Sequence, residues 1–353
     1  MSDQYSYQSL IRRGFKTIMV VVSVITVLIW YLWDWEFQGL SIATIWEQTD
    51  RTLFVLSIVL ISTALPCVAM RWRALFPAEE KSRLNPIDMT GLLCIAFVFN
   101  FVLPGPVGEG VAAWALHKRA KVSVGNSLAG LGLSRIIGLG SACSIAGIVY
   151  WLAPFTIEPK WGNVLIATSV ILGFLAVGMI ALVLFPLIPR RIVGVVRKWS
   201  IFQWALLQRL FNLLDDLLDA LIETAGRGWS SYLESMGWAL SGHALVSSGI
   251  YLAIVSMGMT AEWSAVMFTY SASIAGSVAM FLFPGSSIGW DILFATTLSI
   301  TANLPETVVI AVTAVVRIQQ FLVAIVGGAL ILVQSKDIWE EALAFGQTRE
   351  KEN

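Results

Sequence analysis

Apolar residues in this chain gather in long runs that short polar segments separate. Six runs are long enough to cross a bilayer as helices, and they occupy residues 17–33, 53–70, 126–154, 163–187, 235–257 and 307–333. This pattern predicts an all-α polytopic membrane protein. We expect a single integral membrane domain over residues 1–353 with about six full transmembrane helices.

Two further apolar stretches are interrupted by Pro-Gly sequences, at Pro104-Gly105 and at Pro284-Gly285. Proline removes a backbone donor and glycine permits a sharp turn, so each dipeptide breaks a helix. The two arms of the first stretch are roughly 20 and 15 Å long as helices, whereas the hydrocarbon core is about 30 Å thick. We therefore predict two re-entrant helical hairpins, although the first arm of the second one is long enough to cross.

Composition agrees with a membrane protein. The chain is 57% hydrophobic and 13% charged, whereas soluble domains carry about a quarter charged residues. Lys plus Arg equals Asp plus Glu, so net charge gives no reason to expect a nucleic-acid partner. Basic residues favour the cytoplasmic side and predict that both termini are cytoplasmic in a bacterial inner membrane; they cluster at residues 12–16, 71–73, 81–83, 117–121, 190–198 and 336.

The runs and the charges together divide the chain into segments. Leucines recur at helical spacing near residues 203–223, which indicates an amphipathic helix. The predicted order is two N-terminal spans (17–70), a first repeat unit (87–154), a span (163–187), a cytoplasmic amphipathic segment (190–230), a span (235–257), a second repeat unit (264–333) and a cytoplasmic tail (336–353).

The two repeat units share an order of rare residues. In the first, the Pro-Gly break is followed by Glu109 and then by Arg135; in the second it is followed by Asp291 and then by Arg317, at the same spacing from acid to arginine. Three predicted crossings separate the units, and an odd number of crossings gives the second unit the opposite orientation in the membrane. Inverted repeats with broken helices are typical of secondary transporters.

The buried charges allow a functional and a structural interpretation. An arginine at membrane depth normally faces a partner or a wet cavity, so Arg135 and Arg317 could bind the phosphate or carboxylate of a transported molecule. Alternatively, each arginine pairs with the acid of its own unit, Glu109 or Asp291, and fixes the hairpin to the span. These acids could also stabilise a helix N-terminus or couple transport to protons.

Backbone groups near the breaks are further candidates. The half-helices that start around Gly105–Gly108 and Gly285–Gly289 would direct free N–H groups and a favourable dipole toward an anion. Asn100, just before the first break, could cap freed backbone or contact a head group. His243 is alone in its span and is expected to be packed. The sequence contains no catalytic motif and no metal-ligand spacing, so we expect neither enzymatic activity nor a cofactor.

These motifs resemble a known family, the lysylphosphatidylglycerol synthase/flippase membrane-domain superfamily. The resemblance lies in Asn100 followed by FVLPGPVGEGVAAWAL, in SVGNSLAGLGLSRIIGL around Arg135, and in FPGSSIGWDILFATTL with Arg317 downstream. Asp291 stands where the family usually has glutamate, Ser286-Ser287 loosens its glycine pattern, and Ala112-Ala113-Trp114 stands where an arginine is frequent.

The resemblance implies translocation of a lipid between leaflets, as in flippase domains that move aminoacylated phosphatidylglycerol. Other relatives are linked to polyprenyl-phosphate sugars or hopanoids. We expect no lipid aminoacylation, because that chemistry belongs to a separate soluble domain of the synthases. The expected partner is a phospholipid or polyprenyl-phosphate-linked membrane lipid. Three alternatives stay open: an integral membrane enzyme acting on such lipids, a partner of a lipid-modifying synthase or glycosyltransferase, and a small-anion transporter.

Overall fold

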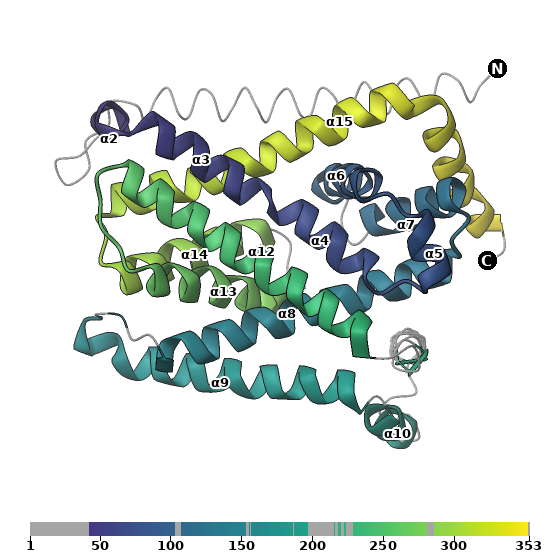
Figure 1. The fold of residues 1–353 in the computed structure, drawn as a ribbon, viewed down its shortest axis with the longest axis horizontal. Coiled ribbons are helices and arrows are strands. Elements are labelled where there is room, and N and C mark those ends of the chain that lie inside the picture. The colour runs from purple at the N-terminus through teal and green to yellow at the C-terminus, as the bar shows by residue number, and fades with distance from the viewer. Residues whose placement is uncertain are drawn as a thin grey trace.

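The computed structural model describes residues 42–102, 107–152, 155, 157–185, 187–196, 215, 218–219, 222–223, 229–280 and 286–351. Helices make up the described regular structure (Figure 1). Their bounds are α2 Ile42–Gln48, α3 Arg51–Ser62, α4 Ala64–Arg73, α5 Ala78–Arg83, α6 Pro86–Val102, α7 Val107–Ala120, α8 Val124–Leu152, α9 Pro159–Leu184, α10 Leu187–Val196, α12 Trp229–Ser256, α13 Trp263–Met280, α14 Ser286–Ala302 and α15 Glu306–Lys351.

The structure confirms an all-α polytopic membrane protein. Within the described residues, 5 segments are long and apolar enough to span a membrane: Arg51–Arg73, Val124–Leu152, Pro159–Leu182, Trp229–Ser256 and Glu306–Gly327. They correspond to five of the six predicted spans. The first predicted span, at residues 17–33, lies outside the described part of the chain.

The span Arg51–Arg73 consists of two helices that meet at Thr63. Asp50 starts it, because its carboxylate accepts hydrogen bonds from the backbone N–H groups of Thr52 and Leu53. Pro66 lies in the first turn of α4 and has no N–H for the carbonyl of Ser62. That missing hydrogen bond explains why the span bends here, a break that the hydrophobic pattern did not predict.

Four apolar helices are shorter than the spans. The helices α6, α7, α13 and α14 contain 17, 14, 18 and 17 residues, so each is about 20–27 Å long. α7 begins at Val107 and α14 at Ser286, directly after the Pro-Gly sequences. α6 packs against α7, and α13 packs against α14. Figure 1 places the first pair toward one end of the long helices and the second pair toward the other.

Close crossings between helices build the interior. A Cβ added to Gly249 of α12 would lie 2.8 Å from the Ser57 carbonyl oxygen of α3. On α15, a Cβ at Gly327 would lie 2.3 Å from the Cys94 carbonyl oxygen of α6. Without a hydrophobic driving force inside lipid, small residues at such crossings let the backbones approach and gain dispersion contacts. These crossings place α12 against α3 and α15 against α6.

The outer surface is apolar where a bilayer would contact it. On α9 the side chains of Ile171, Phe174 and Val177 are 58%, 75% and 65% exposed, which fits a helix with lipid on most of its circumference. α9 packs along α8 at one edge of the molecule (Figure 1). α15 continues as a helix to Lys351, beyond the predicted end of its span at residue 333.

Candidate functional site

The predicted site residues fall into three groups in the structure. Pro104, Gly105, Pro284 and Gly285 lie outside the described residues, as do the side chains of Asn100 and Glu109. Gly108 is buried in the first turn of α7, and Gly289 is half-buried in the first turn of α14. Arg135, Asp291 and Arg317 are described with their side chains. These three residues and their neighbours therefore define the described part of the candidate site.

Asp291 and Arg317 meet in a two-point ion pair between α14 and α15. Arg317 Nε donates to Asp291 Oδ1 at 2.7 Å, and its terminal nitrogen lies 2.6 Å from Oδ2. The other terminal nitrogen donates to Gln320 Oε1. The two charged side chains are only 22% and 31% exposed. This geometry matches the parallel fork that carboxylates and guanidinium groups prefer, and it joins the second hairpin to the following span.

An aromatic stack covers this pair. Trp290 lies with its ring 5.5 Å from the Arg317 guanidinium carbon, and Phe294 stacks on Trp290 with ring centroids 4.9 Å apart. A guanidinium over an indole face gains cation–π energy that grows when water is excluded. Arg317 is thus held by a carboxylate, an amide and an aromatic ring, which explains how an arginine is stable halfway along a span.

Arg135 lies on the outside of α8. It is exposed at the surface of the molecule, and Leu128, two turns earlier on the same helical face, is 44% exposed. The structure therefore does not bring Arg135 together with Arg317 through any described contact.

A third arginine, Arg71, reaches the middle of the membrane domain. Its Nε donates to Ser134 Oγ of α8 at 2.9 Å. Its guanidinium covers Gly138, at the midpoint of α8, so closely that a Cβ there would lie 2.0 Å from a guanidinium nitrogen. Arg71 is also near enough to Arg135 and Tyr270 to interact electrostatically with both. Sequence reasoning treated Arg71 as a flanking cytoplasmic residue and missed this position.

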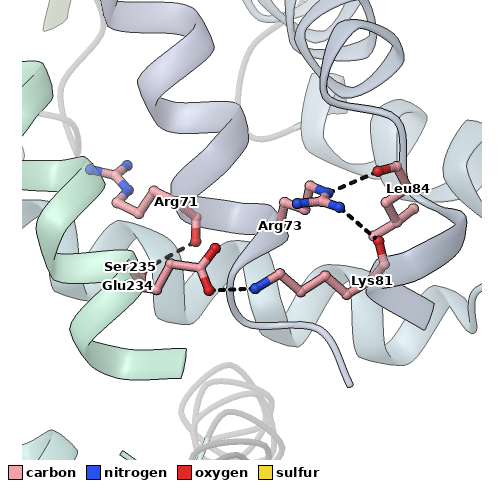
Figure 2. A network of polar contacts seen from close by, with 6 residues as sticks. All are labelled: Arg71, Arg73, Lys81, Leu84, Glu234 and Ser235. Carbon is pink, nitrogen blue, oxygen red and sulfur yellow. Dashed lines mark hydrogen bonds and ion pairs between the residues drawn. The ribbon is translucent and has the colours of Figure 1, made fainter. Parts of the chain in front are cut away.

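Arg73, two residues later on α4, points elsewhere. It donates to the carbonyl oxygens of Leu84 at 2.8 Å and Lys81 at 3.1 Å, and Lys81 forms an ion pair with Glu234 of α12. Figure 2 shows the Arg71 side chain directed away from this network, while its carbonyl oxygen accepts from Ser235 Oγ. Residues two apart on a helix face in different directions. Arg73 therefore fixes the end of α5, whereas Arg71 enters the interior.

His243, at the midpoint of α12, also contacts Gly138. Its Nε2 is 3.1 Å from Ser141 Oγ and 3.3 Å from the Gly138 carbonyl oxygen. A carbonyl can only accept, so Nε2 carries the proton and Nδ1 is an acceptor. Nδ1 is buried and has no hydrogen-bond partner among the residues that the structure describes. The ring also contacts Tyr270 edge-on at 5.8 Å. His243 is buried, as expected, but it is only partly satisfied.

A model described as the lysylphosphatidylglycerol synthase TM region matches residues 18–328. The chain belongs to this family. Neither the curated proteins nor the solved structures contain a match. The lysylphosphatidylglycerol synthase TM region match covers both broken hairpins and every arginine described above, so the chain is a membrane protein related to lipid handling.

The described residues offer electrostatic contacts to a ligand. Among the described residues, no group of three His, Cys, Asp or Glu side chains is arranged to hold a metal ion. Cys67, Cys94 and Cys143 are each buried as free thiols. What the arrangement does offer is cationic donors at membrane depth, and such donors can hold an anionic group.

Proposed function

We propose that this protein moves an anionic or phosphate-bearing lipid between the two leaflets of its membrane. The observation that carries the proposal is a match between two halves of the chain. In each half, an acid follows the helix break, the returning arm ends on a residue in the left-handed conformation, and an arginine follows inside a span.

The left-handed residues strengthen this match. Lys121 (φ 56) directly follows α7 and Asn303 (φ 49) directly follows α14. In the described chain they are the non-glycine residues with positive φ. Lys121 follows Glu109 at the same distance in sequence at which Asn303 follows Asp291. Non-glycine residues adopt this conformation rarely, so an identical placement in both halves supports a repeat.

Equivalent contacts between helices also recur in the two halves. α6 packs against α15, and α13, its counterpart, packs against α8. Likewise, α4 contacts α6, and its counterpart α12 contacts α13. In the same way, α12 contacts α8, and α3 contacts α15. This reciprocity is what a two-fold axis in the membrane plane produces. It supports an inverted repeat that consists of α3–α4 with α6–α8 and of α12 with α13–α15.

The hairpins fit a re-entrant course. Their arms are shorter than the hydrocarbon thickness of about 30 Å. The two pairs lie toward opposite ends of the long helices (Figure 1). Broken helices at membrane depth occur where protein or water satisfies the freed backbone. The N-termini at Gly108 and Gly289 would then present N–H groups and a positive dipole end to an anionic head group.

The arginines would act on the head group in different ways. Arg135 reaches the surface from the middle of α8, so a lipid phosphate can approach it from the bilayer. Arg317 is balanced by Asp291 in this conformation, and an anion could bind it only by displacing that carboxylate. Asp291, and Glu109 in the other half, would therefore tune or couple the movement.

Lipid translocation in proteoliposomes tests the proposal. Head-group-labelled phospholipids and a labelled polyprenyl phosphate are placed in one leaflet, and their appearance in the other is followed for wild type, Arg135→Gln and Arg317→Gln. We expect one lipid class to move in wild type and to slow in both folded variants. Lys160→Gln, in a solvent-exposed ion pair with Glu158, serves as the charge-removal control and should move lipid normally.

Other outcomes would replace the proposal. Covalent change in the recovered lipid would identify an enzyme, and copurification with a synthase or glycosyltransferase without lipid movement would identify a partner. Uptake of a soluble anion without lipid movement would identify a small-anion transporter. Movement undiminished in both arginine variants would remove Arg135 and Arg317 from the site and leave them structural.

A further inference from the structure

Arg71 lacks a compensating charge among the described residues. Its guanidinium has several N–H donors, yet Ser134 Oγ is the one side-chain acceptor that the described part of the chain offers it. By comparison, Arg317 has a carboxylate, an amide and an indole. An arginine inside a membrane domain is costly unless an anion or water compensates it, so Arg71 is placed to hold something.

Positive charge is concentrated at this point. Arg135 follows Ser134 directly on α8, and the two guanidinium groups are near enough to interact. Two like charges at membrane depth repel each other, and an anion held by Arg71 lowers that repulsion. Phosphate is such an anion, because guanidinium groups match its oxygens in pairs.

The helix backbone is shaped to admit Arg71. Gly138 leaves the space that the guanidinium occupies, since a Cβ there would lie 2.0 Å from one nitrogen and 2.5 Å from the central carbon. His243 donates from Nε2 to the carbonyl oxygen of the same glycine. Gly138 therefore lets the Arg71 guanidinium reach the middle of α8.

The site can be reached from the side. Arg71 is half-buried and Arg135 is exposed, and the exposed Leu128 shares the helical face of Arg135. The apolar surface on this face suits acyl chains, whereas a free anion would have to leave water to reach it. Lateral access therefore favours a lipid over a soluble ion.

We propose that Arg71 and Ser134 form a phosphate-binding site at the midpoint of α8 that takes the head group of a membrane phospholipid. This site would bind the lipid during the proposed translocation, through residues that the sequence analysis did not select. The role of the bound lipid rests on the proposed function. Gly138 is a positioning residue, because it acts only through Arg71.

Gly138→Ala provides a test that keeps every charge. The added methyl group would displace only the flexible end of the Arg71 side chain, so the fold is expected to persist. Gly125→Ala on the same helix is the matched control, since a Cβ there meets nothing within 4 Å. Arg71→Gln removes the charge itself, and Arg71→Lys keeps the charge but removes the paired N–H donors of the planar guanidinium.

Lipid retention by the purified protein in detergent is measured by native mass spectrometry, with thermal unfolding of each variant as the folding check. The probes are phosphatidylglycerol, phosphatidylcholine, diacylglycerol and inorganic phosphate. We expect wild type and Gly125→Ala to retain phosphatidylglycerol and not diacylglycerol. Retention should fall about tenfold or more in Arg71→Gln and Gly138→Ala, as when one charge-assisted hydrogen bond is lost, with a smaller fall in Arg71→Lys.

Several results would overturn the site or its parts. Equal phosphatidylglycerol retention in wild type and folded Gly138→Ala refutes it, and that comparison decides even if Arg71→Gln fails to fold. Binding of inorganic phosphate that depends on Arg71 and competes with lipid refutes the lipid source and leaves an anion site. Retention of phosphatidylcholine, which also carries a phosphate, supports phosphate recognition, whereas equal retention of diacylglycerol, which carries none, refutes it.

The same samples separate this inference from the proposed function. If wild type binds phosphatidylglycerol through Arg71 but moves no lipid in proteoliposomes, translocation is wrong and the site stands. If wild type moves lipid and Gly138→Ala binds and moves it equally, translocation stands and the Arg71 site is wrong.

Discussion

Substituting Asp291 by Asn should destabilise the protein by about 2–3 kcal/mol. The structure sets this magnitude. Removing one partner of a buried ion pair costs roughly 3–5 kcal/mol, because the remaining charge stays buried, whereas an exposed pair contributes about 0–1 kcal/mol. The side chains of Arg317 and Asp291 are 22% and 31% exposed, so most of the buried value applies. Trp290 and Gln320 would continue to hold Arg317 in part.

Unfolding in mixed detergent micelles, titrated with a denaturing detergent and followed by circular dichroism, measures the free energy. Asp291→Asn, Arg317→Gln and the double variant form a mutant cycle. Because the double variant leaves no unpaired charge, we expect it to be less destabilised than the sum of the single variants by about 1 kcal/mol or more. Glu79→Gln is the control, since its pair with Arg83 is exposed and contributes about 0.5 kcal/mol at most.

Two results would refute this reasoning. Single-variant effects that add to within about 0.5 kcal/mol would mean that the two side chains do not act as a pair. An effect of Asp291→Asn no larger than that of Glu79→Gln would mean that water screens the pair as fully as at the surface. In either case the ion pair would no longer explain how the second hairpin is fixed to α15.

Two further predictions concern the architecture. In a cysteine-free background, Ile87→Cys and Lys121→Cys, which flank α6–α7, should react with an impermeant thiol reagent from one side of the membrane. Glu262→Cys and Asn303→Cys, which flank α13–α14, should react from the other side. If the two members of either pair reacted from opposite sides, the result would contradict re-entrant hairpins in inverted units. Gly249→Ala should lower the unfolding free energy by about 2 kcal/mol or more, because the Cβ would lie 2.8 Å from the Ser57 carbonyl oxygen and force α3 from α12; Gly237→Ala, whose Cβ meets nothing within 4 Å, is the control, and equal stability of the two variants would count against this crossing.

Much of this fold could be predicted because hydropathy and Pro-Gly dipeptides act locally. Span lengths follow from apolar runs, and α7 and α14 begin where the breaks predict. The Asp291–Arg317 pair was one of two interpretations of a shared spacing, and the structure places the two side chains together. The bend at Thr63 was also accessible, since Pro66 interrupts an apolar run and has no N–H to donate.

Arg71 could not be placed from sequence, and the reason is physical. An arginine at the end of an apolar run has the same local pattern whether it flanks the membrane or turns inward. The difference lies in α8, where Ser134 supplies an acceptor and Gly138 supplies space. Small residues on α8 signal that something approaches closely, but they do not identify it, because the partner is distant in sequence.

The positions of the arginines suggest that the two proposed halves do different work. In the second half, Arg317 is neutralised by Asp291 and shielded by Trp290, so it fixes α14 to α15 at little electrostatic cost. In the first half, Arg71 of α4 brings an additional cation to α8, whereas α12, the proposed counterpart of α3–α4, carries His243 at its midpoint. In the proposed inverted repeat, this difference in charge gives an anion one preferred place. A lipid that crosses this protein would therefore meet its strongest electrostatic attraction beside α8, and the rate of leaving Arg71 would limit how fast it moves on.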